Sequence, residues 1–435
     1  MKSLPIAIMA LVLELVYWLL TQVDIRSDTP GAIRLMMLAL LVYIVSLVFV
    51  IRRKPLISKV FIVATAAMFR ATMAPAAPDL SDDVYRYRWE GLAQTRGLNP
   101  YLTSPDEMGP TDATHARIPA PGVRSGYGPV ASLTEWAALA VAERLTDDPV
   151  GQAFLMKTPA MVFETMTLVV LSRALPIEGL LIYAWSPLPV IEFWWNGHND
   201  ALAIFYMVVA LLLLARSGGN AAAAGSVAMI AHGALGLAIA VKWWPAVLWP
   251  LFVVKTPGGW RKAWIAPAVV ALTALPYWTP EWRQMLTNAR FMSGFVGGWR
   301  NNDSVYGLLL GITGDQYLAK YAAFAILAAA IAWMIARRWP LEQSALGSVV
   351  AMLLVSANCH PWYLTWLTPL AAFVPWPPVF VWQLLMPLSY VVLIEWRARG
   401  EWIGSRPDRW WIYAPVFGAM LVWMALKRRK GRSDY

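Results

Sequence analysis

A short acidic and aromatic segment, residues 79–91, carries side chains that could do chemistry. It contains four carboxylates, Asp79, Asp82, Asp83 and Glu90, interleaved with two arginines and three aromatic residues. Adjacent carboxylates such as Asp82 and Asp83 can take a proton from a hydroxyl group or hold a metal ion. The same charges could instead do no more than end a helix and face water. Residue types and spacing leave both interpretations open.

Other polar side chains stand at the ends of apolar runs elsewhere in the chain. A fixed cation such as Lys242, beside a helix break at Pro245, suits a phosphate group. His198 could equally be a structural residue, and Asn199 or Asp200 could be an ordinary helix cap. The candidate phosphate-binding residues are Lys242, Arg86, Arg290 and Arg300. The candidate substrate-binding residues are Glu192, His198, Asn199, Asp200, Asn302, Asp303, His360, Trp362 and Tyr363.

The elements that must position these side chains are apolar runs of about 17–25 residues, the length that crosses a bilayer. Hydrophobic residues make up 59% of the 435-residue chain and charged residues 14%, far from the balance of a soluble domain. We therefore expect an all-α polytopic membrane protein, built as one integral membrane domain over residues 1–435. The first apolar run follows Met1-Lys2 directly and has no small-residue cleavage site, so we expect it to be a retained span.

The charge and cysteine content exclude several classes of protein. The formal net charge is +10, but the basic residues stand in short clusters between apolar runs, which indicates topology and not nucleic-acid binding. The single cysteine, Cys359, rules out an intrachain disulfide framework, and no ligand spacing typical of zinc occurs. No loop is long enough to form a cytosolic nucleotide-binding domain.

Basic clusters at 52–54, 255–262, 337–338 and 427–430 predict the cytoplasmic side. They give about 12–14 crossings with both termini inside. A polar loop at 75–125, an interfacial helix at 126–145 and a second polar loop at 279–303 are then extracytoplasmic, and every candidate site residue lies at that face. Four arginines in the loop 395–409, also placed outside, fit this topology poorly.

Charged residues inside the apolar runs are candidates for function or for pairing within the bundle. We expect Arg70, near the outer end of its run, to reach the headgroups. Lys157 and Glu164 stand two helical turns apart on one face and could pair with each other.

An ordered set of motifs resembles the GT-C glycosyltransferases. Its closest branch is the polyprenyl-phosphate-mannose-dependent mannosyltransferases of bacterial envelopes, together with the first mannosyltransferase of GPI-anchor assembly. The motifs are Ser81-Asp82-Asp83-Val-Tyr85-Arg86-Tyr87-Arg88-Trp89-Glu90-Gly91, Gly97-Leu-Asn99-Pro100-Tyr101, Tyr127-Gly128-Pro129, Lys157-Thr-Pro159-Ala160, Trp185-Ser-Pro187 through Gly197-His198-Asn199-Asp200, and His360-Pro361-Trp362-Tyr363. They cover most of the chain, whereas the second half of the first outer loop and the last two apolar runs match no motif.

The resemblance implies a GT-C-like helical bundle and a membrane glycosyltransferase. Such an enzyme moves a hexose, with mannose favoured, from a polyprenyl-phosphate-linked donor to a lipid or glycan acceptor at the extracytoplasmic face of the plasma (inner) membrane. Asp82 or Asp83 would act as general base, the phosphate would leave with inversion, and basic residues would stabilise its charge. Some related enzymes bind a divalent metal at the acidic loop, so Mg²⁺ or Mn²⁺ stays an open cofactor. Membrane lipids are the other partners, and nucleic acid is not one.

Two other activities compete with this interpretation. A transporter or flippase of a lipid-linked saccharide would hold its substrate near the midplane with discontinuous helices, whereas the polar residues here concentrate at one surface. A glycan ligase or polymerase would share the outer polar loops. Loss of product in Asp82 and Asp83 variants, with donor supplied on the correct side, favours a transferase over a flippase.

Overall fold

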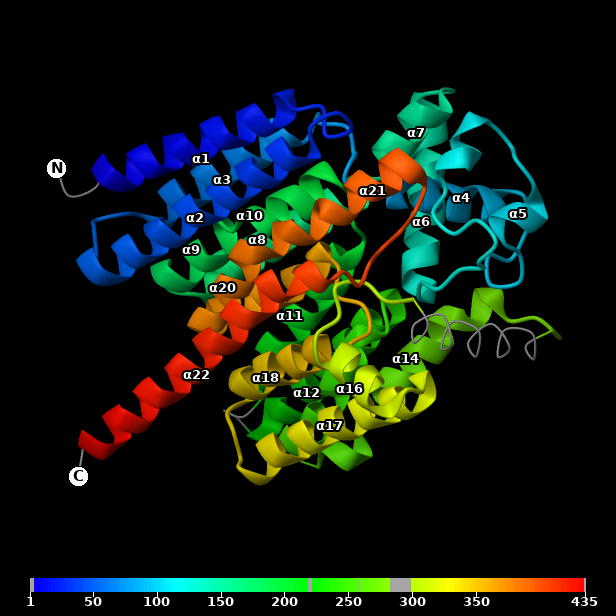
Figure 1. The fold of residues 1–435 in the computed structure, drawn as a ribbon. Coiled ribbons are helices and arrows are strands. Elements are labelled where there is room, and N and C mark those ends of the chain that lie inside the picture. Colours follow the sequence, from blue (N-terminus) through cyan, green and yellow to red (C-terminus); the bar gives the residue numbers. More distant parts are fainter. Residues whose placement is uncertain (1–3, 218–220, 257, 282–298, 434–435) are drawn as a thin grey trace.

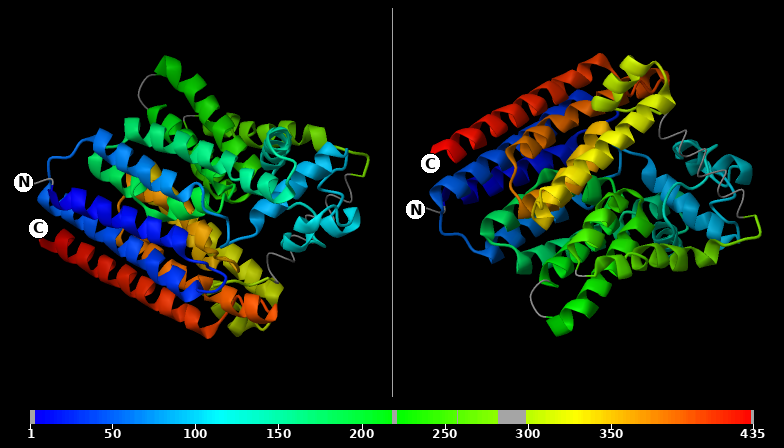
Figure 2. Two further views of the ribbon diagram at one scale, coloured as in Figure 1. Left: turned by 90° about the horizontal axis from the view of Figure 1, so that it is seen from above. Right: turned by 90° about the horizontal axis from the view of Figure 1, so that it is seen from below.

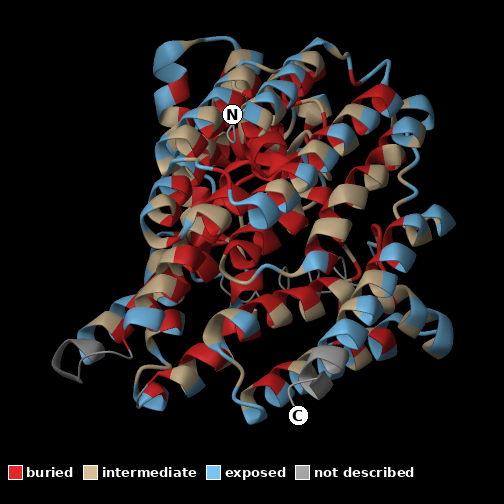
Figure 3. Ribbon diagram, turned by 90° about the vertical axis from the view of Figure 1, so that its left-hand side faces the viewer, coloured by how far each residue is buried: buried red, intermediate tan, exposed pale blue. Residues whose placement is uncertain are grey.

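The chain is helical throughout the part that the computed structural model describes, which is residues 4–217, 221–256, 258–281 and 299–433 (Figure 1). Within these ranges there is no β-strand, and one isolated bridge pairs Asn301 with Asn358. Buried residues gather where helices face one another, while exposed residues follow their outer faces (Figure 3). The all-α architecture predicted from the sequence is confirmed.

The first three helices are α1 (Leu4–Gln22), α2 (Thr29–Arg53) and α3 (Lys59–Met73), and α1 packs against both of the others. Helix α2 begins where the Asp28 carboxylate accepts a hydrogen bond from the backbone of Gly31 at 2.7 Å. Its buried side chains recur every three or four residues, at Met36, Leu40, Tyr43, Leu47 and Val50. The other face is equally apolar but exposed, for example at Leu38 and Val45. A helix that is apolar on all sides suits a lipid environment.

The predicted outer loop 75–125 and interfacial helix 126–145 form a compact helical lobe at one end of the bundle (Figure 1). The lobe consists of α4 (Asp83–Thr95), α5 (Pro105–Met108), η1 (Ala113–Arg117), α6 (Pro129–Leu145) and α7 (Pro149–Leu155). Helices α4 and α6 pack closely at Gly91, where an added Cβ would lie 2.8 Å from that of Leu139. Because only glycine fits there, Gly91 sets the spacing of the two helices.

The remaining described helices complete the bundle behind and beside this lobe. In chain order they are α8 (Thr158–Ala174), α9 (Ile177–Ala184), α10 (Pro187–Pro189), η2 (Val190–Trp195), α11 (Asp200–Arg216), α12 (Ala221–Val241), η3 (Trp244–Leu248), α13 (Trp249–Lys255), η4 (Gly259–Arg261), α14 (Ile265–Ala274), η5 (Leu275–Tyr277), α16 (Val305–Thr313), α17 (Gln316–Ala336), α18 (Leu341–Val355), η6 (Pro361–Trp366), α19 (Leu367–Phe373), α20 (Pro377–Leu385), η7 (Met386–Val391), α21 (Val392–Arg399), η8 (Pro407–Arg409) and α22 (Trp410–Ser433).

Six helical segments among the described residues are long and apolar enough to cross a membrane unaided. They are Leu4–Gln22, Thr29–Arg53, Pro149–Ala174, Gln316–Ala336, Pro377–Arg399 and Pro407–Lys427, and three shorter apolar helices accompany them. The protein is therefore polytopic. Several other expected spans, such as 178–196, are broken into short helices at prolines, which cannot supply the helical N–H. The figure of 12–14 crossings stays a prediction.

Loops that are distant in the sequence meet at the end of the bundle that carries the lobe. Arg397 donates hydrogen bonds to the backbone oxygen of Ile25 at 2.6 Å and to the hydroxyl of Thr29 at 3.0 Å. The guanidinium of Arg26 lies 3.3 Å from the carboxylate of Asp79. The arginine-rich loop 395–409 therefore shares an end with the acidic segment, and one of its arginines, Arg397, bonds to that end.

Both chain ends lie on the side of the molecule away from the lobe (Figure 2). Two lysines make polar contacts on that side, and one of them, Lys255, belongs to a predicted cytoplasmic cluster. The Lys59 ammonium donates to the backbone oxygen of Ser172 at 2.8 Å, and Lys255 donates to that of Trp339. Which of the two ends faces the cytoplasm stays a prediction from the basic clusters.

Single-cysteine variants can test which end faces the cytoplasm. In a Cys359→Ala background, Ser27→Cys and Glu401→Cys at the lobe end should react with an impermeant thiol reagent only from outside the cell. Gln343→Cys, exposed beside the opposite end, should react only from the cytoplasmic side. The predicted orientation fails if Ser27→Cys or Glu401→Cys is labelled only from the cytoplasm.

The expectation that Arg70 reaches the headgroups is wrong. Its side chain is 2% exposed and forms two hydrogen bonds with Glu164, at 2.6 and 2.8 Å. Glu164 consequently does not pair with Lys157, which donates to the backbone oxygens of Ala74 and Ala76 instead. Since α3 and α8 lie side by side, the bidentate pair with Glu164 satisfies the guanidinium inside the bundle.

Candidate active site

The two adjacent aspartates point in different directions because helix α4 begins between them. Asp82 is the residue before the helix, and its carboxylate accepts a hydrogen bond from Arg117 Nε at 3.0 Å. Burial raises the pKa of the Asp82 carboxyl, although the Arg117 guanidinium acts in the opposite direction. The Arg117 guanidinium also lies over the ring of Tyr85, 4.1 Å from its centroid. Asp82 therefore belongs to a partly exposed group of ion-paired side chains that includes Arg117 and Asp79.

Asp83 is the first residue of α4, and its carboxylate faces the bundle. Its Oδ2 accepts a long hydrogen bond of 3.4 Å from the Tyr87 hydroxyl and lies 3.8 Å from His198 Nε2. The side chain of Asp83 is 18% exposed, against 40% for Asp82. Asp83 is thus a carboxylate with weak partners, set at the boundary between the lobe and the membrane bundle.

His198 is held in a tight turn between η2 and α11. Gly197 has a φ of +73°, and a Cβ at this position would lie 2.7 Å from Lys157 Cγ, so the turn requires glycine. Segment η2 is a turn of π-helix, a feature often found at functional sites. It carries Glu192, whose carboxylate lies 3.2 Å from His198 Nδ1 and accepts a hydrogen bond of 2.8 Å from the Tyr390 hydroxyl.

An aromatic stack joins this turn to the loop that precedes η6. The His198 and Trp362 rings stack with centroids 4.3 Å apart, and His360 stacks on Trp362 at 4.4 Å. Nδ1 of His360 lies 3.0 Å from the side-chain amide of Asn301. Trp362 is therefore sandwiched between two histidines, which leaves its edge available to a ligand and covers its faces.

A second polar pair lies beside the stack. Lys242 Nζ contacts Asp200 Oδ2 at 2.5 Å, and Trp366 Nε1 donates to Asp200 Oδ1 at 2.7 Å. Trp366 in turn stacks between Trp244 and Tyr363, at 4.4 and 4.3 Å. The sequence-predicted residues Asp200, Lys242 and Tyr363 are thus brought together.

Asn199 lies on the lobe side of the same turn. Its side chain donates to Glu135 of α6 at 3.1 Å, and its backbone N–H donates to the Tyr87 hydroxyl at 3.3 Å. Tyr87 also contacts Asp83. Asn199 therefore ties the His198 turn to both helices of the lobe.

The other predicted residues lie apart from Asp83. Arg86 points into the lobe and pairs with Glu90 at 3.1 Å, with both side chains buried. Arg300 and Asp303 pair at 2.7 Å, and Ser405 donates to Asp303 at 2.6 Å. Arg290 lies outside the described residues. Among the described residues, no group of three or more His, Cys, Asp or Glu side chains is arranged to hold a metal ion.

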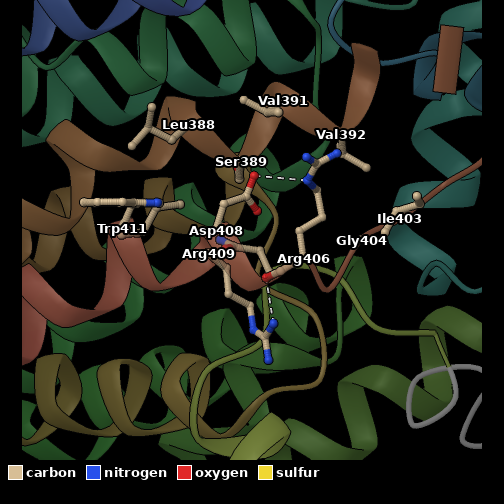
Figure 4. A pocket seen from close by; sticks show the side chains of 12 residues that line it. Leu388, Ser389, Val391, Val392, Ile403, Gly404, Arg406, Asp408, Arg409 and Trp411 are labelled. Carbon is tan, nitrogen blue, oxygen red and sulfur yellow. Dashed lines mark hydrogen bonds and ion pairs between the residues drawn. The ribbon is translucent and has the colours of Figure 1, made fainter. Parts of the chain in front are cut away.

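Asn302 lines a cavity of about 130 Å³ between η7, the loop 400–409 and α22 (Figure 4). Its backbone has a φ of +50°, and its N–H donates to the Gly404 backbone oxygen at 2.7 Å. Apolar side chains form much of the wall, and Arg406, paired with Asp408 at 3.0 Å, forms one side. This cavity adjoins the stack through Asn301, which neighbours Asn302 in the chain.

Several residues of the site were not predicted from the sequence, and Arg117, Tyr390 and Asn301 are examples. Arg117 lies in the part of the loop 75–125 that shows no periodicity, and Tyr390 lies in an apolar run. Asn301 is next to the predicted residues Asn302 and Arg300, and the polar run from Arg300 to Asp303 could have indicated it. For Arg117 and Tyr390 the sequence offers no comparable signal, because their roles depend on packing between distant segments.

A family model described as alpha-(1→6)-mannopyranosyltransferase, N-terminal domain, matches residues 10–257, more than half of the chain. The chain belongs to this family. It is a glycosyltransferase of the mannosyltransferase type, as the motifs predict. None of the curated proteins and none of the solved structures compared with it matches. The matched mannosyltransferase region contains Asp82, Asp83, Glu192, His198 and Lys242, and the partners Trp362 and Tyr390 lie beyond it.

Proposed function

We propose that the protein transfers mannose from a polyprenyl-phosphate-linked donor to a sugar hydroxyl of a lipid or glycan acceptor at the extracytoplasmic face. The family supplies the mannosyl transfer. The observation that supports a lipid-linked donor is the position of Asp83. This residue lies between the lobe and the apolar bundle, next to the His198 turn. A lipid-linked donor reaches such a boundary from the bilayer, whereas a nucleotide sugar would need a soluble binding domain.

In the proposed reaction Asp83 is the general base. Its carboxylate takes the proton of the acceptor hydroxyl while the hydroxyl oxygen attacks the anomeric carbon of mannose. The bond between that carbon and the phosphate oxygen breaks, and the polyprenyl phosphate leaves with the electron pair, with inversion at the anomeric carbon. We assign the base to Asp83 and not to Asp82, because Arg117 already occupies the Asp82 carboxylate.

The acceptor hydroxyl follows from the linkage in the family's description. An alpha-(1→6) product requires a primary hydroxyl at C6 of the acceptor sugar. Trp362 and Tyr363, whose rings line the turn beside Asp83, are proposed to contact the sugars, together with Asn199 and His360. Because His198 and His360 cover the faces of the Trp362 ring, its contact with a sugar would be made by the ring edge.

Lys242 is proposed to contact the donor phosphate, since its side chain is 15% exposed and close to the His198 turn. Lys242→Met should raise the KM for the donor about 10- to 150-fold, because losing one charged hydrogen bond costs about 1.5–3 kcal/mol. The acceptor KM should change little. Lys59→Met, which alters a lysine at the opposite end, is the matched control. An unchanged donor KM in Lys242→Met would remove this residue from the phosphate site.

Purified protein in detergent micelles tests the proposed function, because a flippase forms no glycosidic bond there. We expect an alkyl mannoside to gain one hexose when polyprenyl-phospho-mannose is the donor. An alkyl 6-deoxymannoside, which lacks the C6 hydroxyl, should give no product. Polyprenyl-phospho-glucose and nucleotide-linked mannose should be poor donors. Transfer from nucleotide-linked mannose alone, or no transfer from any donor, would refute the proposal.

A further inference from the structure

The two ring nitrogens of His198 have different surroundings. Only hydrogen-bond acceptors lie near Nδ1, and Nε2 has no hydrogen-bond partner among the described residues. Nδ1 lies 3.2 Å from a carboxylate oxygen of Glu192 and 3.1 Å from the backbone oxygen of the same residue. Both neighbours are acceptors, so Nδ1 must carry a proton. Nε2 is fully buried and has no hydrogen-bond partner in the described part of the chain.

A carboxylate, which is an acceptor, lies close to Nε2. Asp83 Oδ2 lies 3.8 Å away. If the ring were neutral, its Nε2 lone pair would face a carboxylate oxygen in a buried space, which is unfavourable for both groups. A proton on either Nε2 or the Asp83 carboxylate removes this conflict. The two possibilities have opposite consequences, since a protonated Asp83 cannot accept a proton from a substrate.

The surroundings favour a proton on the ring. Charged and titratable groups face His198 from each element packed against it: Asp83 and Tyr87 of α4, Glu192 of η2, Asp200 of α11, Lys242 at the end of α12, His360 before η6, and Tyr390 of η7. Burial alone would lower the pKa of His198, but the hydrogen bond to Glu192 and the charges of Glu192, Asp83 and Asp200 raise it above its usual value.

The ring is also fixed in orientation. Trp362 covers one face at a centroid distance of 4.3 Å, and Glu192 holds Nδ1. Glu192 is itself held by the Tyr390 hydroxyl, at 2.8 and 3.1 Å from its two carboxylate oxygens. A chain of contacts therefore runs from Tyr390 through Glu192 and His198 to Asp83, and it leaves Nε2 one direction in which to donate.

We propose that His198 is a positively charged positioning residue, whose Nε2–H orients the Asp83 carboxylate and sets a positive charge beside it. This inference rests on the proposed function, in which Asp83 is the base. A shift of about 1 Å by either side chain turns the 3.8 Å contact into a charge-assisted hydrogen bond. One carboxylate oxygen of Asp83 is then held by His198, and the other faces the acceptor hydroxyl.

The pH dependence of transfer tests this role. An imidazolium within about 4–6 Å lowers the pKa of a carboxyl group by about one to three units. Replacing His198 by Gln removes that positive charge from beside the proposed base. The acid limb of the kcat/KM profile should then move to higher pH by about one to three units.

Two control variants check this result. His198→Lys restores a cation and should return the acid limb toward its parent position. His232→Gln, which alters a buried histidine bonded to Thr256, should change neither the limb nor the rate.

The protonation state of His198 can also be measured directly in the parent protein, without an activity assay and without a His198 variant that folds. The chain has four histidines, so ¹⁵N-histidine spectra of the whole protein in nanodiscs resolve few imidazole signals. Single replacements of His115, His232 and His360 identify three of them and leave the fourth as His198. At pH 7 we expect His198 to be protonated at both nitrogens, and Glu192→Gln to shift it toward the neutral form.

These results separate failure of the inference from failure of the proposed function. A neutral His198 in the parent protein at pH 7 overturns the inference, and so does an unmoved acid limb in His198→Gln or a Lys variant that behaves like the Gln variant. If the parent forms no mannosyl product from any lipid-linked donor, the proposed function fails, while the protonation state of His198 is still measured.

Discussion

Replacing Asp83 by Asn should lower kcat for mannosyl transfer by about 100- to 10,000-fold, the loss that follows removal of a general base. Asn keeps the size and hydrogen-bonding reach of Asp but cannot accept a proton. The variant should still fold, because the Asp83 carboxylate makes only a 3.4 Å hydrogen bond and a 3.8 Å contact. Initial rates with polyprenyl-phospho-mannose as donor measure the effect, and thermal unfolding in detergent checks the fold.

Asp82→Asn is the matched control for this prediction. It removes a neighbouring carboxylate of the same segment, but one that pairs with Arg117. We expect a smaller loss of rate from Asp82→Asn than from Asp83→Asn. If Asp83→Asn transfers mannose at nearly the parent rate, Asp83 is not the base. Asp82 would then be the next candidate, followed by Glu192, Asp200 and His360.

Breaking the buried pair between Arg70 and Glu164 should destabilise the protein more than any other single change considered above. Glu164→Leu leaves a buried guanidinium without its counter-ion, which typically costs about 3–5 kcal/mol. The Trp194 indole N–H would lose its acceptor as well, since it donates to Glu164 at 2.9 Å. The measurement is the temperature of unfolding of the purified protein at fixed detergent and lipid concentration.

The double variant Arg70→Met/Glu164→Leu separates the cost of an unpaired charge from that of altered packing. Apolar replacement of a whole buried pair is often neutral or stabilising, so the double variant should recover most of the lost stability. A double variant as unstable as Glu164→Leu would show that the pair is not the source of the effect.

Sequence patterns predict the helices well where one apolar run forms one helix. Helix α2 (Thr29–Arg53) is an example, because its length and its buried stripe follow directly from the residues. The expected span 178–196 is a different case, since it consists of α9, α10 and the π-helical turn η2. Pro187 and Pro189 indicate a break, but the register that turns Glu192 toward His198 depends on packing against η7 and α8.

The candidate site was predictable as a list of residues but not as an arrangement. The motifs single out Asp83, His198 and Trp362, yet nothing in the sequence shows that these three meet. Asp82 and Asp83 could not be told apart, because their directions depend on where α4 begins. Arg70 was misplaced for a related reason, since a carboxylate on α8, distant in the sequence, provides its partner.

Vesicles of known orientation show from which side the protein uses its donor. Purified protein is reconstituted into vesicles, which are sorted by whether the C-terminal tail is open to protease. A short-chain, water-soluble polyprenyl-phospho-mannose and an alkyl mannoside acceptor are then added outside only. Transfer should occur in vesicles whose tail is protected, where the Asp83 end faces outward, and should be lost in Asp83→Asn. Transfer confined to vesicles with an exposed tail would contradict the account.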